Sequence, residues 1–401
     1  MIELRLIGSE EVITYDPQRN LLLKNDVPYS VVDKRPSSDS LNLRLALGKK
    51  CNFACAYCIQ SVSKQDGPEQ SLDLDILADE IIRFLGRRKI QTLSFWGGEP
   101  FLYLDEMKSL LARLKPSLEE AGNGNAVIFT NGSLLADSRV SDWILVNPEI
   151  FIMLSYDGPG QDVRGRNIFD DPLIVERVKW LSTHDRLGFS SVFTKANHSV
   201  AALTEDLAQR LGREFKSVVD ADFLQIVDQS SADLAAYDDQ LRACLMETYA
   251  GLVSGRVRMM PKIKMLLEFI ASRFGRVNQA APCHALSDHT LTVDLEGNLL
   301  VCQTISSRDD GGSYCLGNIR DQPAGAPVPV PRGAAIRQRW ATLCADCHVR
   351  HFCAGGCLLA EEEWQPLNCR QKIYKHLLVL MCLVTAVTGR TVKEVRIIKH
   401  G

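Results

Sequence analysis

The stretch that decides the fold is Leu41-Asn-Leu-Arg-Leu-Ala-Leu47, followed after three residues by Cys51-Asn-Phe-Ala-Cys55-Ala-Tyr-Cys58. The apolar run predicts a strand, and the cysteines lie in the loop directly after it. Three cysteines this close together in a chain whose thiols stay reduced indicate metal ligation rather than disulfides. Three thiolates can hold a [4Fe–4S] cube and leave its fourth iron open, whereas structural zinc takes four protein ligands.

Strand and helix patterns alternate from this stretch onward. Apolar runs predict strands at 41–47, 92–95, 126–130, 150–155, 188–193 and 223–227. Helical spacing predicts helices at 74–85, 107–118, 137–146, 173–181, 203–211, 234–252 and 263–274. Such βα units predict an α/β fold with a parallel sheet, and because six units are too few for a closed eight-fold barrel, we expect a partial (β/α)6 TIM-type barrel.

Composition excludes several classes of protein. The chain has 401 residues, 46% of them hydrophobic and 24% charged, with a net charge of −3, so it lacks the basic surface on which nucleic-acid binding depends. Its longest apolar run, Leu377 to Val387, is well short of the ~20 residues that span a bilayer, and the first residues do not form a signal peptide. We therefore expect a cytoplasmic protein with no nucleic-acid or membrane partner.

Polar motifs follow the predicted strands. Trp96-Gly-Gly-Glu-Pro100 follows the second strand, Thr130-Asn-Gly132 the third and Ser155-Tyr-Asp-Gly-Pro159 the fourth, while Thr194 and Asn197 follow the fifth. Each motif alone is more typical of a turn or a helix cap than of a binding site. Together they fall at the carboxyl ends of parallel strands, which is where barrels carry their chemistry.

These features together resemble the radical S-adenosylmethionine (SAM) enzymes, whose defining loop has the spacing of Cys51, Cys55 and Cys58 with an aromatic residue before the last cysteine. The resemblance implies a [4Fe–4S] cluster on these three cysteines, with SAM on its open iron cleaved to a 5′-deoxyadenosyl radical. It also implies cofactor-binding positions at Tyr57, Gly97, Gly98, Glu99, Pro100, Thr130, Asn131, Ser155, Asp157, Thr194 and Asn197.

One segment departs from the family pattern. Relatives carry a His-Asp pair and then an arginine after Asp-Gly-Pro, whereas this chain continues as Gly160-Gln-Asp-Val-Arg-Gly-Arg166 without a histidine. The family role of the arginine therefore does not transfer to Arg164 or Arg166, and no catalytic residue is assigned.

The later cysteines resemble the SPASM domain, a small cysteine-rich iron–sulfur extension of radical SAM enzymes. Cys283 and Cys302 frame a C-x13-G-x4-C pattern, and a C-x2-C-x5-C-x3-C run and a final cysteine follow. The resemblance implies two auxiliary [4Fe–4S] clusters. It assigns Cys283, Cys302 and Cys357 to the first, and Cys344, Cys347, Cys353 and Cys369 to the second. A zinc site on Cys344, Cys347, Cys353 and Cys357 is the alternative.

The fourth ligand of the first auxiliary cluster is not given by the pattern. Cys315 follows Gly311-Gly312-Ser313 and is predicted to lie on a loop flexible enough to reach the cluster. The alternatives are an open iron that binds a substrate thiolate, or a buried thiol that binds nothing. Cys244 and Cys382 lie in apolar helical stretches and are predicted to be packing residues.

These interpretations divide the chain into an amino-terminal β-rich extension (1–40), a radical SAM partial barrel (41–275), a SPASM domain (276–375) and a carboxy-terminal helix and tail (376–401). SPASM relatives mostly modify peptides, so we expect a maturase of a ribosomally made peptide that forms a thioether or carbon–carbon cross-link or a related oxidation. Alternatives are an anaerobic sulfatase-maturating, formylglycine-forming enzyme and an iron–sulfur electron-transfer protein. Expected partners are the precursor peptide, a flavodoxin or ferredoxin, and a separate leader-binding protein.

Overall fold

The computed structural model describes most of the chain, with gaps. The described residues are 1–25, 27–28, 40–58, 60, 73–118, 126–192, 199–212, 218–222, 234–257, 264, 267, 287–308, 312, 314–330, 342, 344–353 and 365–398. Four predicted site residues, Cys283, Cys357, Thr194 and Asn197, lie outside these ranges, as do the predicted strand at 223–227 and nearly all of the predicted helix at 263–274.

The larger sheet has nine strands and confirms the α/β prediction. Its order is β10-β9-β8-β7-β6-β5-β11-β12-β13, and neighbours from β10 to β11 are parallel. The strands are β5 (Ser40–Ala46), β6 (Lys89–Trp96), β7 (Ala126–Thr130), β8 (Ile150–Ser155), β9 (Leu187–Val192), β10 (Val218–Asp222), β11 (Thr290–Asp294), β12 (Asn298–Leu300) and β13 (Cys315–Asn318). In the part of the chain described, β10 and β13 do not pair with each other, so the sheet is open.

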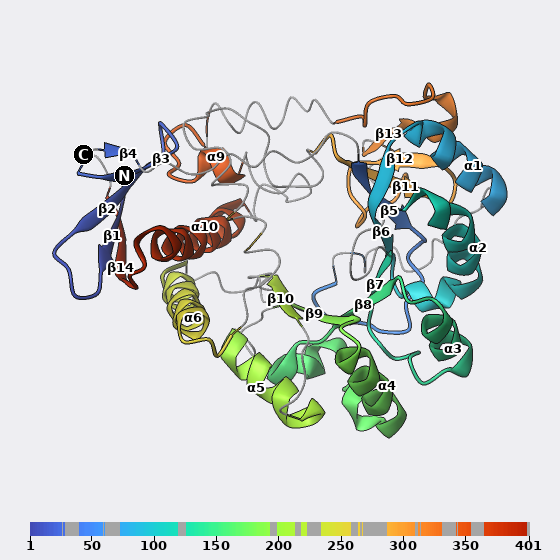
Figure 1. Cartoon of the computed structure of the whole chain (residues 1–401), viewed down its shortest axis with the longest axis horizontal. Helices are drawn as coiled ribbons and strands as arrows, with labels where there is room; N and C mark the ends of the chain where they lie inside the picture. Colours follow the sequence, from blue (N-terminus) through green and yellow to red (C-terminus); the bar gives the residue numbers. More distant parts are fainter. Residues whose placement is uncertain are drawn as a thin grey trace.

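Helices follow the barrel strands in the predicted alternation. They are α1 (Leu74–Leu85), α2 (Leu104–Leu114), α3 (Ser138–Val146), α4 (Pro172–Thr183), α5 (Val200–Leu211) and α6 (Leu234–Val253). Figure 1 shows α1 to α5 along one side of the curved sheet. Alternate residues of β7 and β8 are buried, as expected for strands whose one face packs against helices.

The structure adds one strand to the prediction and corrects one helix. Strand Val218–Asp222 was not predicted, and the predicted run directly after it, 223–227, lies outside the described residues. The second helix begins at Leu104 rather than 107 and ends at Leu114, where a 3₁₀ turn at Lys115–Ser117 replaces its predicted last turn. Pro116 accounts for that end because proline removes a helical donor and its ring disfavours a continuing α-helix.

A second sheet joins the two ends of the described chain. Its order is β14-β1-β2-β3-β4, with β1 (Ile2–Leu6), β2 (Val12–Asp16), β3 (Leu21–Lys24), β4 (Val27–Pro28) and β14 (Val392–Ile397). The amino-terminal extension and the carboxy-terminal tail therefore share one antiparallel sheet. The four-segment division of the chain stays a proposal, and this pairing shows that its first and last segments are in direct contact.

The apolar run at 377–387 lies in α10 (Gln365–Thr388), which packs beside α6 (Figure 1). Leu377 through Val384 are buried, and the Gln371 side chain donates to the Tyr237 hydroxyl of α6 at 2.8 Å. Cys244 and Cys382 are 1% and 8% exposed, which confirms their prediction as packing residues. Among the helices described, none has the length and apolar character needed to cross a membrane. Short helix α9 (Arg350–Cys353) precedes α10.

Candidate active site

The three clustered cysteines leave β5 together in one loop. Cys51, Cys55 and Cys58 are all half-buried, and the Cys58 amide donates to the Cys55 carbonyl at 3.1 Å. The Phe53 amide donates to the Cys51 sulfur at 3.4 Å, as backbone donors commonly do toward a metal-bound thiolate. Burial raises the pKa of Cys51 and of Cys55 above the ordinary thiol value, so an electropositive ligand is needed to keep both as thiolates.

The donors of this loop are three thiols and no histidine or carboxylate. Three thiols of one loop are the ligands expected for a [4Fe–4S] cube with one open iron. Cys51, Cys55 and Cys58 would hold that cube.

The Gly-Gly-Glu-Pro turn packs directly on the segment that leads into Cys51. The Gly98 amide donates to the Gly48 carbonyl at 2.9 Å, and the Glu99 amide donates to the Lys50 carbonyl at 2.8 Å. A Cβ on Gly98 would lie 2.3 Å from the Lys50 oxygen, and one on Gly97 would lie 2.6 Å from the Gly48 oxygen. Glycine is therefore required at both positions for this backbone contact.

Glu99 ties this turn to the next strand. The Glu99 side chain is 0% exposed, and its carboxylate accepts from the Thr130 hydroxyl at 2.7 Å, the Asn131 amide at 2.8 Å and the Phe101 amide at 3.1 Å. Burial raises the pKa of Glu99 to about 7, although these hydrogen bonds oppose the rise. The Gly-Gly-Glu-Pro turn and the Thr-Asn-Gly turn are thus bonded to each other through Glu99, Thr130 and Asn131, which were all predicted to contact SAM. Pro100 is buried at the start of a 3₁₀ turn.

Asn131 extends the same connection to the cysteine loop. Its side-chain amide donates to the Asn52 side-chain oxygen at 2.8 Å and lies 3.9 Å from the Cys51 sulfur. Its own oxygen accepts from the Ser133 amide and hydroxyl at 2.9 and 2.6 Å. The carboxyl ends of β5, β6 and β7 are therefore joined by hydrogen bonds around the first cysteine.

Asp157, after β8, binds Arg164, for which no role was predicted. Arg164 donates to its carboxylate from Nε at 2.8 Å and from Nη2 at 3.0 Å, and the Tyr57 hydroxyl also donates to it. The Val192 amide at the end of β9 donates to the same carboxylate at 2.8 Å. Asp157 is 0% exposed, so its carboxylate serves groups of the protein itself. Ser155, two residues earlier, is half-buried at the end of β8.

The four cysteines expected at the second auxiliary cluster lie in one region of the structure. Cys353 is half-buried, and desolvation raises the pKa of its thiol to about 12, while Cys347, Cys369 and Cys344 are near enough to act on it electrostatically. The Cys347 amide donates to the Cys344 carbonyl at 3.2 Å. The zinc alternative requires Cys357, which lies outside the described residues.

Cys302 and Cys315 lie at the same end of one hairpin. Leu300 pairs with Cys315 in antiparallel register, and the Val301 amide donates to the Tyr314 carbonyl at 3.1 Å, immediately before Cys302. Cys315 begins strand β13 and so does not lie on the flexible loop that the glycines predicted. The hairpin still brings it beside Cys302, as ligation of one cluster by both would require.

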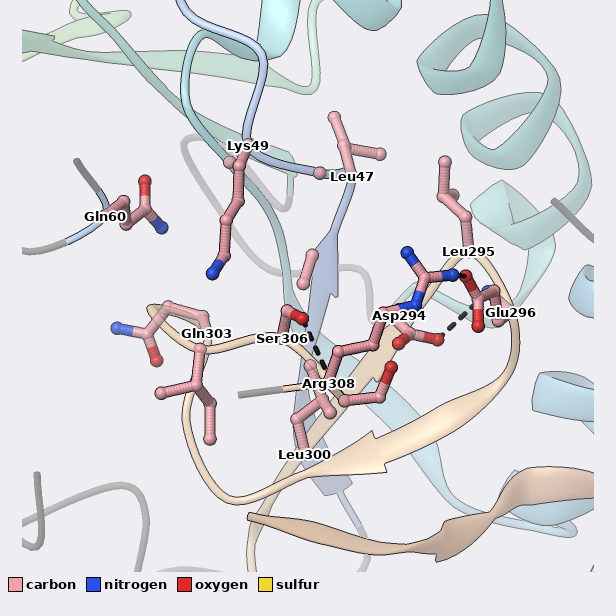
Figure 2. Close-up of a pocket in the computed structure, with 15 residues that line it drawn as sticks. Leu47, Lys49, Gln60, Asp294, Leu295, Glu296, Leu300, Gln303, Ser306 and Arg308 are labelled. Carbon is pink, nitrogen blue, oxygen red and sulfur yellow. Dashed lines mark hydrogen bonds and ion pairs between the residues drawn. The ribbon is translucent and has the colours of Figure 1, made fainter. Parts of the chain in front are cut away.

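A pocket opens between the cysteine loop and this hairpin. Figure 2 shows Lys49 extending from the loop toward Gln303 and Ser306 of the hairpin. On its far side Arg308 forms an ion pair with Glu296 at 2.7 Å. Gln303 also accepts from Arg44 of β5 at 2.6 Å, which links the residue after Cys302 to the barrel. Sequence analysis named neither Gln303 nor Arg44, because their contact spans 259 positions.

Comparison with known proteins identifies the part of the site that is formed by the cysteine loop and the turns after β6, β7 and β8. Residues 45–167 match the family model of the Radical SAM superfamily. The chain contains a radical SAM domain. The match includes the cysteine loop and the motifs after β6, β7 and β8, so the predicted family is confirmed for this part of the chain. Among curated proteins, GTP 3′,8-cyclase of Stenotrophomonas maltophilia (strain K279a) is 30% identical over 147 residues, which are 36% of this chain and 38% of the relative. The match thus covers well under half of that relative.

Solved structures resemble a larger share of the chain. The anaerobic sulfatase maturase anSMEcpe with bound AdoMet superposes with a TM-score of 0.62 at 16% identity, over 87% of this chain and 100% of the other. Streptococcus suis SuiB superposes with a TM-score of 0.53 at 16% identity, over 80% of this chain and 73% of the other. At these identities the likeness shows that the radical SAM domain and the segments around it share the fold of those proteins.

Proposed function

We propose that this chain is a SAM-cleaving enzyme that oxidises a side chain of a ribosomally made peptide. The observation that carries the proposal is the convergence of Cys51, Cys55 and Cys58 with the turns after β6, β7 and β8 at one edge of the sheet. A [4Fe–4S] cluster with bound SAM supplies there a 5′-deoxyadenosyl radical that removes a hydrogen atom from the substrate. An electron-transfer protein would have no use for a SAM-binding edge.

The residues of the chain position and protect this chemistry. Glycines 97 and 98 allow the turn after β6 to lie against the cysteine loop, and Glu99 and Asn131 fix that turn to β7. Thr194 and Asn197, which follow β9 in the sequence, would complete the SAM contacts. A cytosolic flavodoxin or ferredoxin would supply the electron.

The extent of the structural match and the cysteines after β11 together favour a peptide over a nucleotide substrate. The curated GTP 3′,8-cyclase match covers 36% of the chain, whereas the superposition on anSMEcpe with bound AdoMet and Cp18Cys peptide covers 87% at a TM-score of 0.61. We propose two auxiliary clusters, with Cys283, Cys302, Cys315 and Cys357 at the first and Cys344, Cys347, Cys353 and Cys369 at the second. They would accept the electron that leaves the substrate radical. A separate protein would bind the leader of the precursor.

Formation of formylglycine on a sulfatase is the second candidate. The extent of the anSMEcpe superposition favours it. Two features favour a peptide cross-link instead. The residues after Asp157 depart from the family pattern, and Arg164 forms an ion pair with the Asp157 carboxylate. The chain also has amino-terminal strands that pair with β14.

Co-expression with each class of substrate separates the candidates. A short Cys- or Trp-bearing peptide encoded beside the gene should lose two hydrogens per cross-link, as read by tandem mass spectrometry. A sulfatase whose active-site Cys or Ser becomes an aldehyde would replace the first candidate by the second. Turnover of a free amino acid at comparable efficiency, with neither polypeptide changed, would contradict both.

A further inference from the structure

Arg164 is a buried arginine that lies next to the cysteine loop. It is 7% exposed, and its guanidinium meets the Asp157 carboxylate through two parallel hydrogen bonds of 2.8 and 3.0 Å. A two-point bond of this kind fixes both the position and the orientation of the guanidinium. The pair is held to the sheet, because Asp157 also accepts from the Val192 amide at 2.8 Å and its own amide donates to the Gln161 side chain at 2.9 Å.

The Arg164–Asp157 pair also contacts the cysteine loop. The Arg164 guanidinium carbon lies 5.3 Å from the ring centre of Tyr57, and the Tyr57 hydroxyl donates to Asp157. The neighbouring Ala56 amide donates to the Val163 carbonyl at 3.1 Å. Ala56 and Tyr57 are the two residues between Cys55 and Cys58, so each is bonded to the segment that carries Arg164.

The guanidinium of the ion pair contacts the loop, because its carbon lies 5.3 Å from the ring centre of Tyr57, the residue immediately before Cys58. An arginine stays protonated at every working pH. A fixed cation beside a cluster favours its reduced, more negative form and so raises its reduction potential.

We propose that Arg164 is a positioning residue for the SAM-cleaving cluster: it holds the Cys55–Cys58 segment in place through Asp157 and Tyr57, and its charge raises the reduction potential of that cluster. The proposal rests on the radical SAM domain and is independent of what the substrate is.

Arg166 provides a matched control in the same segment. Its guanidinium carbon lies 5.3 Å from the ring centre of Phe53, which is also in the cysteine loop, but Arg166 is exposed and has no carboxylate partner among the residues described. Arg164→Gln, Arg164→Lys and Arg166→Gln would be compared with the wild type as reconstituted holoenzymes. The readouts are the rate of iron loss to a chelator and the midpoint potential of the electron paramagnetic resonance signal that changes when SAM is added.

Arg164→Gln should lose the iron of this cluster about ten times faster than the wild type, as supporting partners of metal ligands typically do when removed. Its potential should be more negative. Arg164→Lys keeps the charge but not the two-point bond, so it should lose iron faster while its potential stays near that of the wild type. Arg166→Gln should match the wild type in both measurements.

An Arg164→Gln protein that matches the wild type in iron loss and potential overturns the proposal. If Arg164→Lys has the same midpoint potential as Arg164→Gln, the charge of Arg164 does not set the potential and that part of the proposal is overturned. Should Arg164→Gln not fold, Tyr57→Phe carries the test, because it removes only the hydroxyl bonded to Asp157. It should lose iron faster than the wild type, and wild-type retention would overturn the positioning role.

Discussion

The buried carboxylate of Glu99 accepts the backbone amide of Asn131 at 2.8 Å, which bonds the turn after β6 to the turn after β7. The side-chain amide nitrogen of Asn131 in turn lies 3.9 Å from the Cys51 sulfur. One acidic side chain therefore connects the two motifs beside the first cysteine, and its protonation affects the stability of the whole edge.

Glu99 should make stability depend on pH. Its pKa is raised from 4.5 to about 7 in the folded chain, so the folded state holds a proton that the unfolded state releases. The resulting stability is fully present below pH ~4.5 and is lost as pH rises to about 7, a change of about 2 kcal/mol between pH 5.5 and 8. Glu99→Gln should remove this dependence. Thermal unfolding of both anaerobic holoenzymes at the two pH values measures it, and equal slopes would contradict the assignment.

Gly98→Ala should damage the site more than its volume suggests. The added methyl would lie 2.3 Å from the Lys50 oxygen and 2.5 Å from the Lys49 oxygen, both backbone atoms that cannot move without displacing the loop before Cys51. We expect loss of SAM binding and a stability loss of about 2 kcal/mol. Gly188→Ala in β9 is the control, because its methyl would meet only side-chain atoms, the end of Met153 and the ring edge of Phe151, each at 3.1 Å. Equal SAM binding by both variants would refute the prediction.

Replacement of Cys51, Cys55 and Cys58 by alanine should abolish formation of 5′-deoxyadenosine while roughly two-thirds of the iron remains, if the two proposed auxiliary cubes are bound elsewhere in the chain. Chromatography of the SAM cleavage products and iron analysis measure this. Cys244→Ala, a change in the buried interior of α6, should leave both unchanged. Continued deoxyadenosine formation in the triple variant would place SAM cleavage elsewhere.

Cys315→Ala should lower the iron and sulfide content and change the spectrum of an auxiliary cluster. The expectation rests on the pairing of Leu300 with Cys315, which brings that thiol to the end of the hairpin that carries Cys302. Full iron and sulfide with an unchanged spectrum would show that Cys315 is not a ligand. The alternatives of an open iron or a thiol that binds nothing would then apply.

Local patterns predicted much of this fold. The helix at Leu74–Leu85 matches its predicted bounds because apolar spacing and the Asp73 cap act within a few residues of each other. The strands at Ala126–Thr130 and Ile150–Ser155 match for the same kind of reason. Strand Val218–Asp222 was missed because it contains two aspartates and lacks the apolar run that marked the others.

Motifs of neighbouring residues could be predicted from the sequence, whereas contacts between separate turns and strands could not. The spacing of Cys51, Cys55 and Cys58 marked the loop that lies within the match to the radical SAM family model. The bonds of Arg164 to Asp157 and of Arg44 to Gln303 depend on how turns and strands are brought together, and no spacing rule indicates either pair. Sequence analysis marked the run around Arg164 only as a departure from the family pattern.

The parallel pairing of β11 with β5 has a mechanical consequence. Five residue pairs, from Thr290 with Asn42 to Asp294 with Ala46, join the strand before the cysteine loop to the strand before the Cys302 hairpin. A hinge between these two parts would have to break that ladder of hydrogen bonds. Electrons passing between metal centres on either side would therefore tunnel across a span of nearly constant length, and their transfer rate would not be gated by domain opening.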